Sequence, residues 1–318
     1  MRPKIYIDGH VGTTGLRIHE LLSARDDLEL LTIRDERRKD PDARRDRMLA
    51  ADIAILCLPD REAAEAATWV AACSARLIDA STAHRVSEGW VYGLPELCYN
   101  QRDLIRNAKF VSNPGCYASA FVLLVRPLVD SGLATRDVPV VVHGLSGYSG
   151  GGRAMIERWE DPGTGLSRLT HEAPYGFDAV HKHVPEMVKY SGLKTQPQFL
   201  PAVGPFRRGM RVQIQIHAAG LPEGIDETGI WDVLHERYRD EPFIKVVSLI
   251  DQPKADEKTF DPQGCNDTNR MEIRVLAHPS GHLTLMATLD NLGKGASGAA
   301  IQNLNLMLGL SEGTGLRA

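Results

Sequence analysis

The sequence predicts an α/β protein in which a domain with a parallel sheet is joined to an α+β domain with a mainly antiparallel sheet. Three observations support this fold class. Short apolar runs alternate with helical stretches early in the chain, later apolar runs alternate with period two, and a glycine-rich turn follows the first run. The 318 residues, 43% of them hydrophobic, suffice for one large domain or two ordinary ones.

The first part of the chain is predicted to form βαβ units. The apolar run 4–7 predicts a strand, and the apolar positions between 16 and 22 predict one face of a helix that ends near residues 23–24. Further buried strands are predicted at 28–33, 53–58 and 77–78, with an alanine-rich helix at 61–73. Strands that alternate with helices in this way form a parallel sheet.

After about Cys116 the pattern changes to that of a sheet with one exposed face. Strands are predicted at 138–142, 211–216, 271–276 and 283–289. The short polar link 278–282 predicts that the last two form a hairpin. A final amphipathic helix is expected from about residue 296 to residue 308.

Composition narrows the class of function. The formal net charge is −4, and the charged run 34–47 holds seven basic and five acidic residues, so we expect a solvated surface there and no nucleic-acid partner. No stretch approaches the ~20 apolar residues of a membrane span. Residues 1–10 reach Asp8 and Gly9 too soon for a signal peptide. We therefore expect a cytoplasmic protein without a membrane partner.

The cysteine and histidine spacings argue against a metal site. Five cysteines, an odd number without a CxxC pair, fit neither a disulfide framework nor a zinc site. The histidines lack a ligand spacing such as HExxH. We expect free thiols in a reducing compartment and no bound metal.

A glycine turn follows the first predicted strand. Gly9, Gly12 and Gly15 form G-x-x-G-x-x-G, a variant of the dinucleotide fingerprint. Glycines let the backbone turn tightly and approach a pyrophosphate, which the amides at the helix N-terminus then bind. Thr13 and Thr14 add hydroxyl donors. The turn predicts a Rossmann-like, dinucleotide-binding domain.

The residues after the second predicted strand bear on the choice of dinucleotide. About 20 residues past the glycines, an acid would bind a ribose 2′-hydroxyl and a base would bind a 2′-phosphate. Arg34 comes first, and Asp35 and Glu36 follow it. We favour NADP, bound by Arg34, over NAD, although spacing alone leaves both open.

Cys116 has surroundings unlike those of the other four cysteines. The segment 110–120 predicts a strand, a turn at Asn113-Pro114-Gly115 and a helix that begins at Cys116. A helix N-terminus stabilises a thiolate, and the thiolate is the nucleophile. The position predicts a catalytic cysteine, and we interpret the others as ordinary free thiols.

The segment Asn113-Pro114-Gly115-Cys116-Tyr117-Ala118 resembles the active-site motif of the N-acetyl-gamma-glutamyl-phosphate reductases, an enzyme family of arginine biosynthesis. Further motifs similar to those of this family lie at 9–15, 92–97, 149–153, 181–186 and 290–296. The chain length and the segment 79–85 resemble the family's shorter, type 2 form. The related aspartate-semialdehyde dehydrogenases usually carry Asn in place of Gly115.

This resemblance implies an activity and a domain organisation. The expected reaction is the NADPH-dependent reduction of N-acetyl-gamma-glutamyl phosphate to N-acetylglutamate 5-semialdehyde and phosphate, through a thioester on Cys116. Residues 1–115 and 293–318 are expected to form a discontinuous NADP-binding domain. Residues 116–292 are expected to form a catalytic and oligomerisation domain of a homodimer or homotetramer.

The acid/base of this reaction is sought among His181 and His183. Being two apart, they would share one face of a strand but lie about 200° apart on a helix, where only one could face the thiol. The resemblance favours a histidine of this motif. We choose His183 first and His181 second.

The remaining predicted contacts are spread over several motifs. The glycine-rich turn at 149–152 would let Gly150 approach the nicotinamide or the substrate, and the resemblance implies cofactor contacts at Ser81 and Asn291. Arg153, Arg207 and Arg208 are candidates for binding the substrate carboxylate or the phosphate, because a guanidinium binds such groups bidentately. We also assign Asn113 to substrate binding.

Two other functions stay open. One is an aspartate-semialdehyde dehydrogenase or another acyl-phosphate or aldehyde dehydrogenase of the same architecture. The other is a dinucleotide-sensing protein that keeps the fold without catalysis, and the presence of Cys116 with the pair His181 and His183 argues against it.

Overall fold

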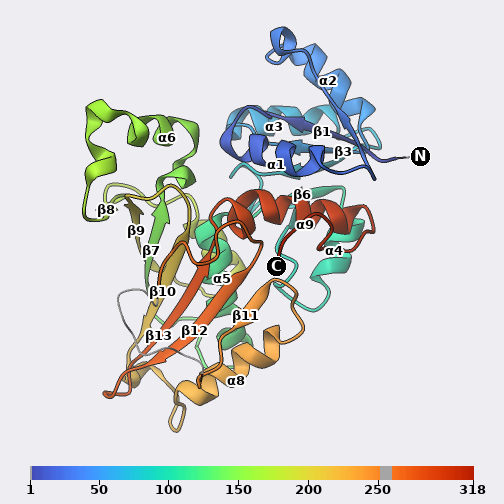
Figure 1. Ribbon diagram of the computed structural model, residues 1–318. Coiled ribbons are helices and arrows are strands. Elements are labelled where there is room, and N and C mark those ends of the chain that lie inside the picture. The colour runs from blue at the N-terminus through green and yellow to red at the C-terminus, as the bar shows by residue number, and fades with distance from the viewer. Residues whose placement is uncertain (1, 251–259) are drawn as a thin grey trace. The chain divides into compact units, whose positions relative to one another are not determined.

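The computed structural model describes residues 2–250 and 260–318. Its chain divides into two compact units, Met1–Pro114 with Ala296–Leu316 and Gly115–Gly295 with Arg317–Ala318. We call them the first and the second unit. Each is built on a sheet of its own, and the C-terminal helix, red in Figure 1, belongs to the first unit.

The first unit contains a six-stranded sheet in the order β2-β1-β3-β4-β6-β5, and all of its paired strands are parallel. Its strands are β1 (Lys4–Asp8), β2 (Glu29–Leu31), β3 (Ile53–Leu56), β4 (Arg76–Asp79), β5 (Val91–Tyr92) and β6 (Phe110–Ser112). Its helices are α1 (Thr13–Ser23), α2 (Pro41–Ala50), α3 (Asp60–Trp69), α4 (Gln101–Asn107) and α9 (Gly298–Met307). The predicted parallel sheet is confirmed, as are helices near the predicted positions of α1, α3 and α9. The prediction that the last helix is amphipathic is wrong, because α9 is buried along its whole length, and α4 was not predicted.

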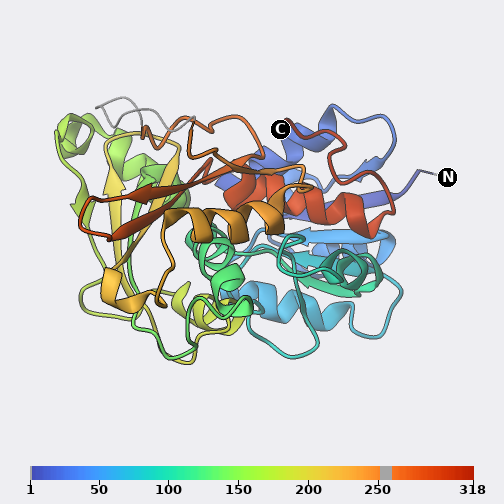
Figure 2. The same ribbon diagram turned by 90° about the horizontal axis from the view of Figure 1, so that it is seen from below.

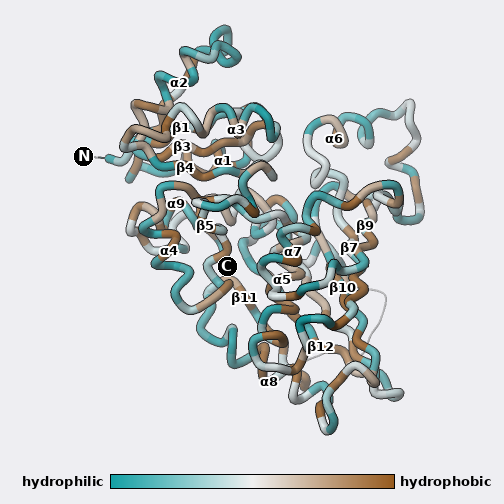
Figure 3. The backbone as a smooth tube through the Cα atoms, turned by 180° about the vertical axis from the view of Figure 1, so that it is seen from behind, coloured by the Kyte–Doolittle hydropathy of each residue, from teal (hydrophilic) through white to brown (hydrophobic). Residues whose placement is uncertain are grey.

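Alternate residues of these strands pack against two layers of helices. Ile5 and Ile7 of β1 join a cluster with residues of α1, α4 and α9. Tyr6, on the opposite face of the same strand, joins a cluster with residues of α2 and α3. Both faces of the central strands are therefore buried, which explains their continuous apolar runs. Figure 3 shows this hydrophobic colour along β1 and β3.

The second unit contains a seven-stranded sheet in the order β11-β12-β13-β10-β7-β9-β8. Its strands are β7 (Val141–Gly147), β8 (Ala173–Pro174), β9 (Gln198–Gly204), β10 (Met210–Ile216), β11 (Ile244–Val246), β12 (Met271–Ala277) and β13 (Leu283–Leu289). The pairs β7–β9 and β11–β12 are parallel and the other four are antiparallel, so the sheet is mixed and mostly antiparallel, as predicted. The predicted hairpin is β12–β13.

Within its described residues, the second unit has the α-helices α5 (Cys116–Asp130), α6 (Gly152–Glu160), α7 (Val184–Ser191) and α8 (Glu227–Tyr238). The helix α5 is almost wholly buried, and the hydroxyl of Tyr238 in α8 donates to the Leu123 carbonyl within it at 2.8 Å. Figure 2 shows α8 beside the β12–β13 hairpin. Alternation along β10, where Val212 is buried and Arg211 is partly exposed, leaves one face of the sheet more open.

One strand differs from its prediction. The apolar run 138–142 predicts a strand, yet β7 begins at Val141 and continues through Gly144 to Gly147. A Cβ at Gly144 would lie 2.5 Å from the Tyr117 ring, so glycine is required where this strand meets α5. Apolar patterning misses such a position, because close packing against an aromatic ring selects the glycine.

Within the described residues, no helix is long and apolar enough to cross a membrane. The same residues contain no group of three or more His, Cys, Asp or Glu side chains that could hold a metal ion. The five cysteines are free thiols.

Candidate active site

The glycine turn joins β1 to α1 and requires glycine at two positions, Gly9 and Gly15. Gly9 has a φ of 87°, and a Cβ there would overlap the carbonyl oxygen of Cys57. A Cβ at Gly15 would overlap the Gly9 carbonyl oxygen. The backbone of β1, β3 and α1 therefore approaches more closely than side chains would allow.

The N-terminus of α1 fits a pyrophosphate. Gly12 is the N-cap residue, and no side chain caps this helix. The first amides, from Thr13 to Gly15, thus point out of the helix toward an incoming acceptor, as at other anion-binding helix ends. This uncapped helix N-terminus after the glycine turn fits the dinucleotide predicted from the sequence.

The residues predicted to select the dinucleotide lie just beyond β2. Arg34 is exposed and precedes the short 3₁₀ turn Asp35–Arg37. The Asp35 carboxylate lies 3.9 Å from Nε2 of His10, which belongs to the glycine turn. The cation and the acid are therefore neighbours beyond the same strand.

One residue of the charged run 34–47 is not a solvated surface residue, contrary to the expectation from the sequence. The guanidinium of Arg44 in α2 donates to both carboxylate oxygens of Asp8, at 3.0 to 3.2 Å. Asp8 is 2% exposed and directly precedes the glycine turn. This ion pair ties α2 to the end of β1, and charge density in the sequence gave no sign of it.

Ser81 and Asn113 have internal partners in the first unit. The Ser81 hydroxyl donates to Asp79 at 2.8 Å and accepts from the N–H of Ala83 at 3.2 Å. The Asn113 side chain donates to the Ala296 carbonyl at 3.0 Å and accepts from Asn303 at 3.2 Å. Asn113 thereby holds the end of β6, from which the chain leads into Cys116.

Cys116 is the first residue of α5 and is partly exposed. The preceding residue, Gly115, is the N-cap, and its N–H donates to the buried carboxylate of Glu186 in α7 at 3.0 Å. A Cβ at Gly295 would lie 2.8 Å from the Cys116 Cβ, so glycine is also needed beside the thiol. The predicted strand, turn and helix around Cys116 are confirmed, and the thiol lies at the positive end of the helix dipole.

The two predicted histidines lie together in an irregular segment just before α7. Neither a strand nor a helix carries both, because His183 is the N-cap residue of α7. Their rings are 4.7 Å apart at 86°, and the Tyr117 ring lies 5.8 Å from His181 and 5.9 Å from His183. Tyr117 follows the cysteine, so the structure gathers both histidines around the start of α5.

The hydrogen bonds of His181 engage both of its ring nitrogens. Nδ1 accepts from the backbone N–H of His183 at 3.1 Å, and Nε2 lies 3.3 Å from the Tyr175 hydroxyl. Because Nδ1 accepts, the proton of a neutral ring is on Nε2. Burial, aided by the nearby Cys116, raises the pKa of Tyr175 to about 12. This phenol stays neutral at physiological pH, and its oxygen can accept from Nε2 in the tautomer that the His183 N–H selects.

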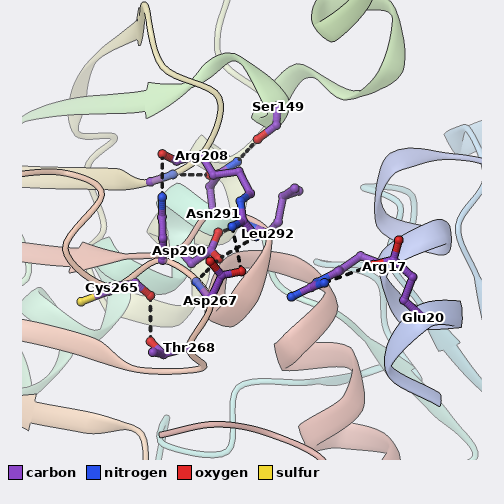
Figure 4. A network of polar contacts seen from close by, with 12 residues as sticks. Arg17, Glu20, Ser149, Arg208, Cys265, Asp267, Thr268, Asp290, Asn291 and Leu292 are labelled. Carbon is purple, nitrogen blue, oxygen red and sulfur yellow. Dashed lines mark hydrogen bonds and ion pairs between the residues drawn. The ribbon is translucent and has the colours of Figure 1, made fainter. Parts of the chain in front are cut away.

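Asn291 and the glycine-rich turn come together in the second unit. The Asn291 side chain accepts from the Gly209 N–H at 2.8 Å and donates to the Ser149 hydroxyl at 2.9 Å. A Cβ at Gly150 would lie 3.6 Å from the side-chain amide nitrogen of Asn291. Two motifs separated by about 140 residues in the sequence thus form one cluster, which Figure 4 shows.

The three candidate arginines all pair with carboxylates. Arg208 lies 2.7 Å from Asp267 and 3.6 Å from Asp290 (Figure 4). Arg207 lies 3.4 Å from Glu160, and Arg153 lies 2.7 Å from Glu157 one turn along α6. The Arg153 side chain is 70% exposed, so its pair is a surface interaction.

Sequence reasoning missed Glu186 and Tyr175 as members of the cysteine surroundings. Glu186 lies within the motif at 181–186, so its contact with Gly115 had a signal in the resemblance. Tyr175 had none, because only the fold brings the end of β8 to His181.

Comparison with known families divides the chain in two. Residues 14–106 match the family described as semialdehyde dehydrogenase, NAD binding domain. Residues 116–291 match the family described as semialdehyde dehydrogenase, dimerisation domain.

Curated relatives match the chain over nearly its full length. A protein of Trichormus variabilis named N-acetyl-gamma-glutamyl-phosphate reductase is 45% identical, over 99% of both chains. One from Pseudomonas putida, named N-acetyl-gamma-glutamyl-phosphate reductase 2, is 43% identical over 98% of this chain and 99% of its own. Aspartate semialdehyde dehydrogenase II from Vibrio cholerae shares the fold, with a TM-score of 0.74 at 18% identity, over 97% of this chain and 99% of that one.

Proposed function

Because the chain belongs to the N-acetyl-gamma-glutamyl-phosphate reductase family of semialdehyde dehydrogenases, we propose that it reduces N-acetyl-gamma-glutamyl phosphate to N-acetylglutamate 5-semialdehyde. NADPH would be the reductant and phosphate the second product. The family places the reaction in arginine biosynthesis, and we propose a cytoplasmic location for it.

One observation carries the proposal beyond the family relation. Cys116 lies in the first turn of α5, and the rings of His181 and His183 surround the tyrosine that follows it. A partly exposed thiol at a helix N-terminus beside imidazoles has the surroundings of a nucleophilic cysteine.

We propose that the Cys116 thiolate attacks the acyl carbonyl of the substrate. The new C–S bond forms a tetrahedral intermediate, the C–O bond to phosphate breaks, and a thioester on Cys116 remains. Reduction of that thioester gives a hemithioacetal oxyanion, which expels the thiolate and releases the semialdehyde. Two easier steps replace one difficult one.

His183 is the acid/base of this proposal. It would take the proton from the Cys116 thiol and, as an imidazolium, donate a hydrogen bond to the oxygen of each tetrahedral intermediate. We keep His183 as the first choice and give His181, whose ring nitrogens contact the His183 N–H and the Tyr175 hydroxyl, the supporting role. His181 then orients the segment that carries His183.

The proposed cofactor contacts come from five parts of the chain. The glycines at 9, 12 and 15 with Thr13 and Thr14 would bind the pyrophosphate, and Arg34 the 2′-phosphate. Ser81, Gly150 and Asn291 would line the nicotinamide side. When bound, NADPH supplies the hydride that reduces the thioester.

For the substrate we propose Arg153 and Arg208 as anion-binding residues. Both guanidiniums now pair with carboxylates, and a substrate carboxylate or phosphate would compete with those carboxylates for the same donors. Asn113 would contribute its second amide hydrogen, because its first is bound to Ala296.

We also propose a homo-oligomer, a dimer or a tetramer, assembled through the second unit. The supporting observations are the match of residues 116–291 to a dimerisation domain and the more open face of the mixed sheet. Sedimentation would measure the assembly directly.

The test runs the reaction in reverse with N-acetylglutamate 5-semialdehyde, phosphate and either NADP⁺ or NAD⁺. We expect nicotinamide reduction that requires phosphate and is faster with NADP⁺. Aspartate semialdehyde serves as the competing substrate, and faster turnover of it would favour the alternative dehydrogenase. The Cys116→Ser variant should be inactive while still binding NADPH. Full activity in that variant, or no reduction by the wild type, would reject the proposal.

A further inference from the structure

A buried carboxylate organises the loop that follows β4 in the first unit. Asp79 is 0% exposed, and its carboxylate accepts from the Ser81 N–H at 2.9 Å and from the Ser81 hydroxyl at 2.8 Å. It also lies 2.6 Å from Nδ1 of His84. Three hydrogen bonds satisfy the buried charge and fix the loop.

The ring of His84 is held in a single orientation. It stacks on the Trp90 indole, with centroids 4.0 Å apart and 11° between the planes, and Trp90 in turn stacks on Phe110 at 5.0 Å. The side chain remains 14% exposed. A ring clamped on its face and on one edge presents its remaining edge, which carries Nε2.

The partners of Asp79 determine the tautomer of His84. A carboxylate accepts hydrogen bonds, and Oδ2 also accepts from Ser81, so Nδ1 of His84 carries the hydrogen. In the neutral ring Nε2 is then an acceptor. Among the described residues, the interactions of His84 leave Nε2 without a hydrogen-bond partner.

The order of the strands indicates that a bound dinucleotide would extend past the loop after β4. The carboxyl ends of parallel strands share one edge, where ligands of such sheets bind. In the order β1-β3-β4-β6, the loop after β4 lies between the glycine turn after β1 and the end of β6, which leads into Cys116. A dinucleotide with its pyrophosphate on the glycine turn must pass β4 to bring its nicotinamide toward that end.

We propose that His84 is a cofactor-binding residue whose Nε2 accepts a hydrogen bond from a hydroxyl of the nicotinamide ribose, with Asp79 as the positioning residue. The inference rests on the proposed use of NADP(H), and it adds a contact of that cofactor from the loop after β4. A ribose hydroxyl is the suitable partner because it donates, whereas a phosphate only accepts.

The test compares two variants that lose the stack on Trp90 equally. His84→Asn keeps an amide near the position of Nδ1, able to donate to Asp79, but has no group at Nε2. His84→Gln places an amide near Nε2 and loses the donor to Asp79. Binding of NADPH and of adenosine 2′,5′-bisphosphate, which lacks the nicotinamide ribose, would be titrated calorimetrically, together with thermal unfolding of the free protein.

We expect His84→Asn to bind NADPH about three- to tenfold more weakly, the effect of one hydrogen bond, and to bind the bisphosphate as the wild type does. His84→Gln should bind NADPH more tightly than His84→Asn despite a lower melting temperature. Wild-type NADPH affinity in His84→Asn, or an equal loss for both ligands, would overturn the inference. Failure of the wild type to bind NADPH would instead reject the proposed function.

Discussion

The glycine turn of the first unit presents backbone amides, whereas the start of α5 in the second unit presents a thiol near two imidazoles. The backbone of the turn requires that side chains be absent, because a Cβ at Gly9 or Gly15 would overlap backbone atoms. The proposed site around Cys116 instead requires particular side chains, because an imidazole and a thiol from distant segments must lie near each other. The glycine spacing marks the turn in the sequence, whereas the contact of Gly9 with Cys57 and the contacts around Cys116 depend on the fold.

The surroundings of two cysteines, one in each unit, also differ. Cys57 follows β3 beside the glycine turn, and its carbonyl oxygen is the atom that a Cβ at Gly9 would overlap. Burial, helped by the carboxylates of Asp79 and Asp8, raises the pKa of Cys57 to about 12. Both residues have intermediate exposure, but Cys116 lies at a helix N-terminus, which stabilises a thiolate.

The largest expected effect is therefore a difference in thiol reactivity. With a pKa of about 12 rather than the ordinary 9.0, Cys57 has about 10³-fold less thiolate at pH 8. Iodoacetamide at pH 8, followed by peptide mass spectrometry, should label Cys116 and leave Cys57 unlabelled. The raised pKa favours the protonated folded state, so this contribution to stability is present below pH 9 and is lost as the pH rises toward 12.

The control for this comparison is the Cys116→Ser variant. In this variant the total iodoacetamide labelling at pH 8 should fall by the amount that Cys116 contributes in the wild type. The labelling of Cys57 should not change. Equal labelling rates for the two cysteines in the wild type would contradict the assigned environments.

The next effect divides the two histidines. His183→Asn should lower kcat by about 10²-fold or more, the usual contribution of a general acid/base, and should remove one limb of the pH–rate profile. His181→Asn should lower kcat less and keep the profile's shape, because His181 orients its neighbour through the bond from the His183 N–H. The measurement is kcat against pH for both variants. A larger loss in His181→Asn, with its pH dependence removed, would exchange the two roles.

The two histidines also show a limit of structure prediction from sequence periodicity. The spacing of two offered a shared strand face or opposite helix faces, and the structure has neither, since the helix begins after His183. Two rings at 86° with a backbone bond between them are a geometry of the irregular segment, for which periodicity has no rule. The glycine turn and the helix at Cys116, in contrast, follow from local rules and are confirmed.

Contacts between distant segments formed the part that the sequence could not predict. The resemblance singled out Asn291, but its bonds to Gly209 and Ser149 depend on how three segments meet in one sheet. Asp79 and His84 lie in a recognised segment as well, yet the stack of His84 on Trp90 requires the packing of Trp90 on Phe110. Such contacts are set by tertiary packing, which no local pattern records.

A smaller effect tests the backbone site. Gly9→Ala should weaken NADPH binding at least tenfold and lower the melting temperature, because the new methyl group would overlap the Cys57 carbonyl and shift the turn. Gly89→Ala is the matched control in the same unit, since Gly89 has a φ of 78° but open space around its Cβ position. It should cost only the roughly 1–2 kcal/mol of the left-handed backbone, with NADPH affinity unchanged. Equal losses of affinity would refute the close approach as the cause.

The smallest effect concerns the choice of dinucleotide at the edge of the backbone site. Arg34→Ala should weaken NADPH about tenfold and leave NADH unchanged, because NADH has no 2′-phosphate. A charge-assisted bond contributes about 1.5–3 kcal/mol, and its lower limit, about tenfold, applies to an exposed residue such as Arg34. Arg38→Ala removes an exposed cation four residues away and serves as the control for general charge. Both affinities should be measured at two salt concentrations, since screening weakens an exposed contact. If Arg34→Ala weakens NADH as much as NADPH, the guanidinium supports the turn beside Asp35 rather than the phosphate.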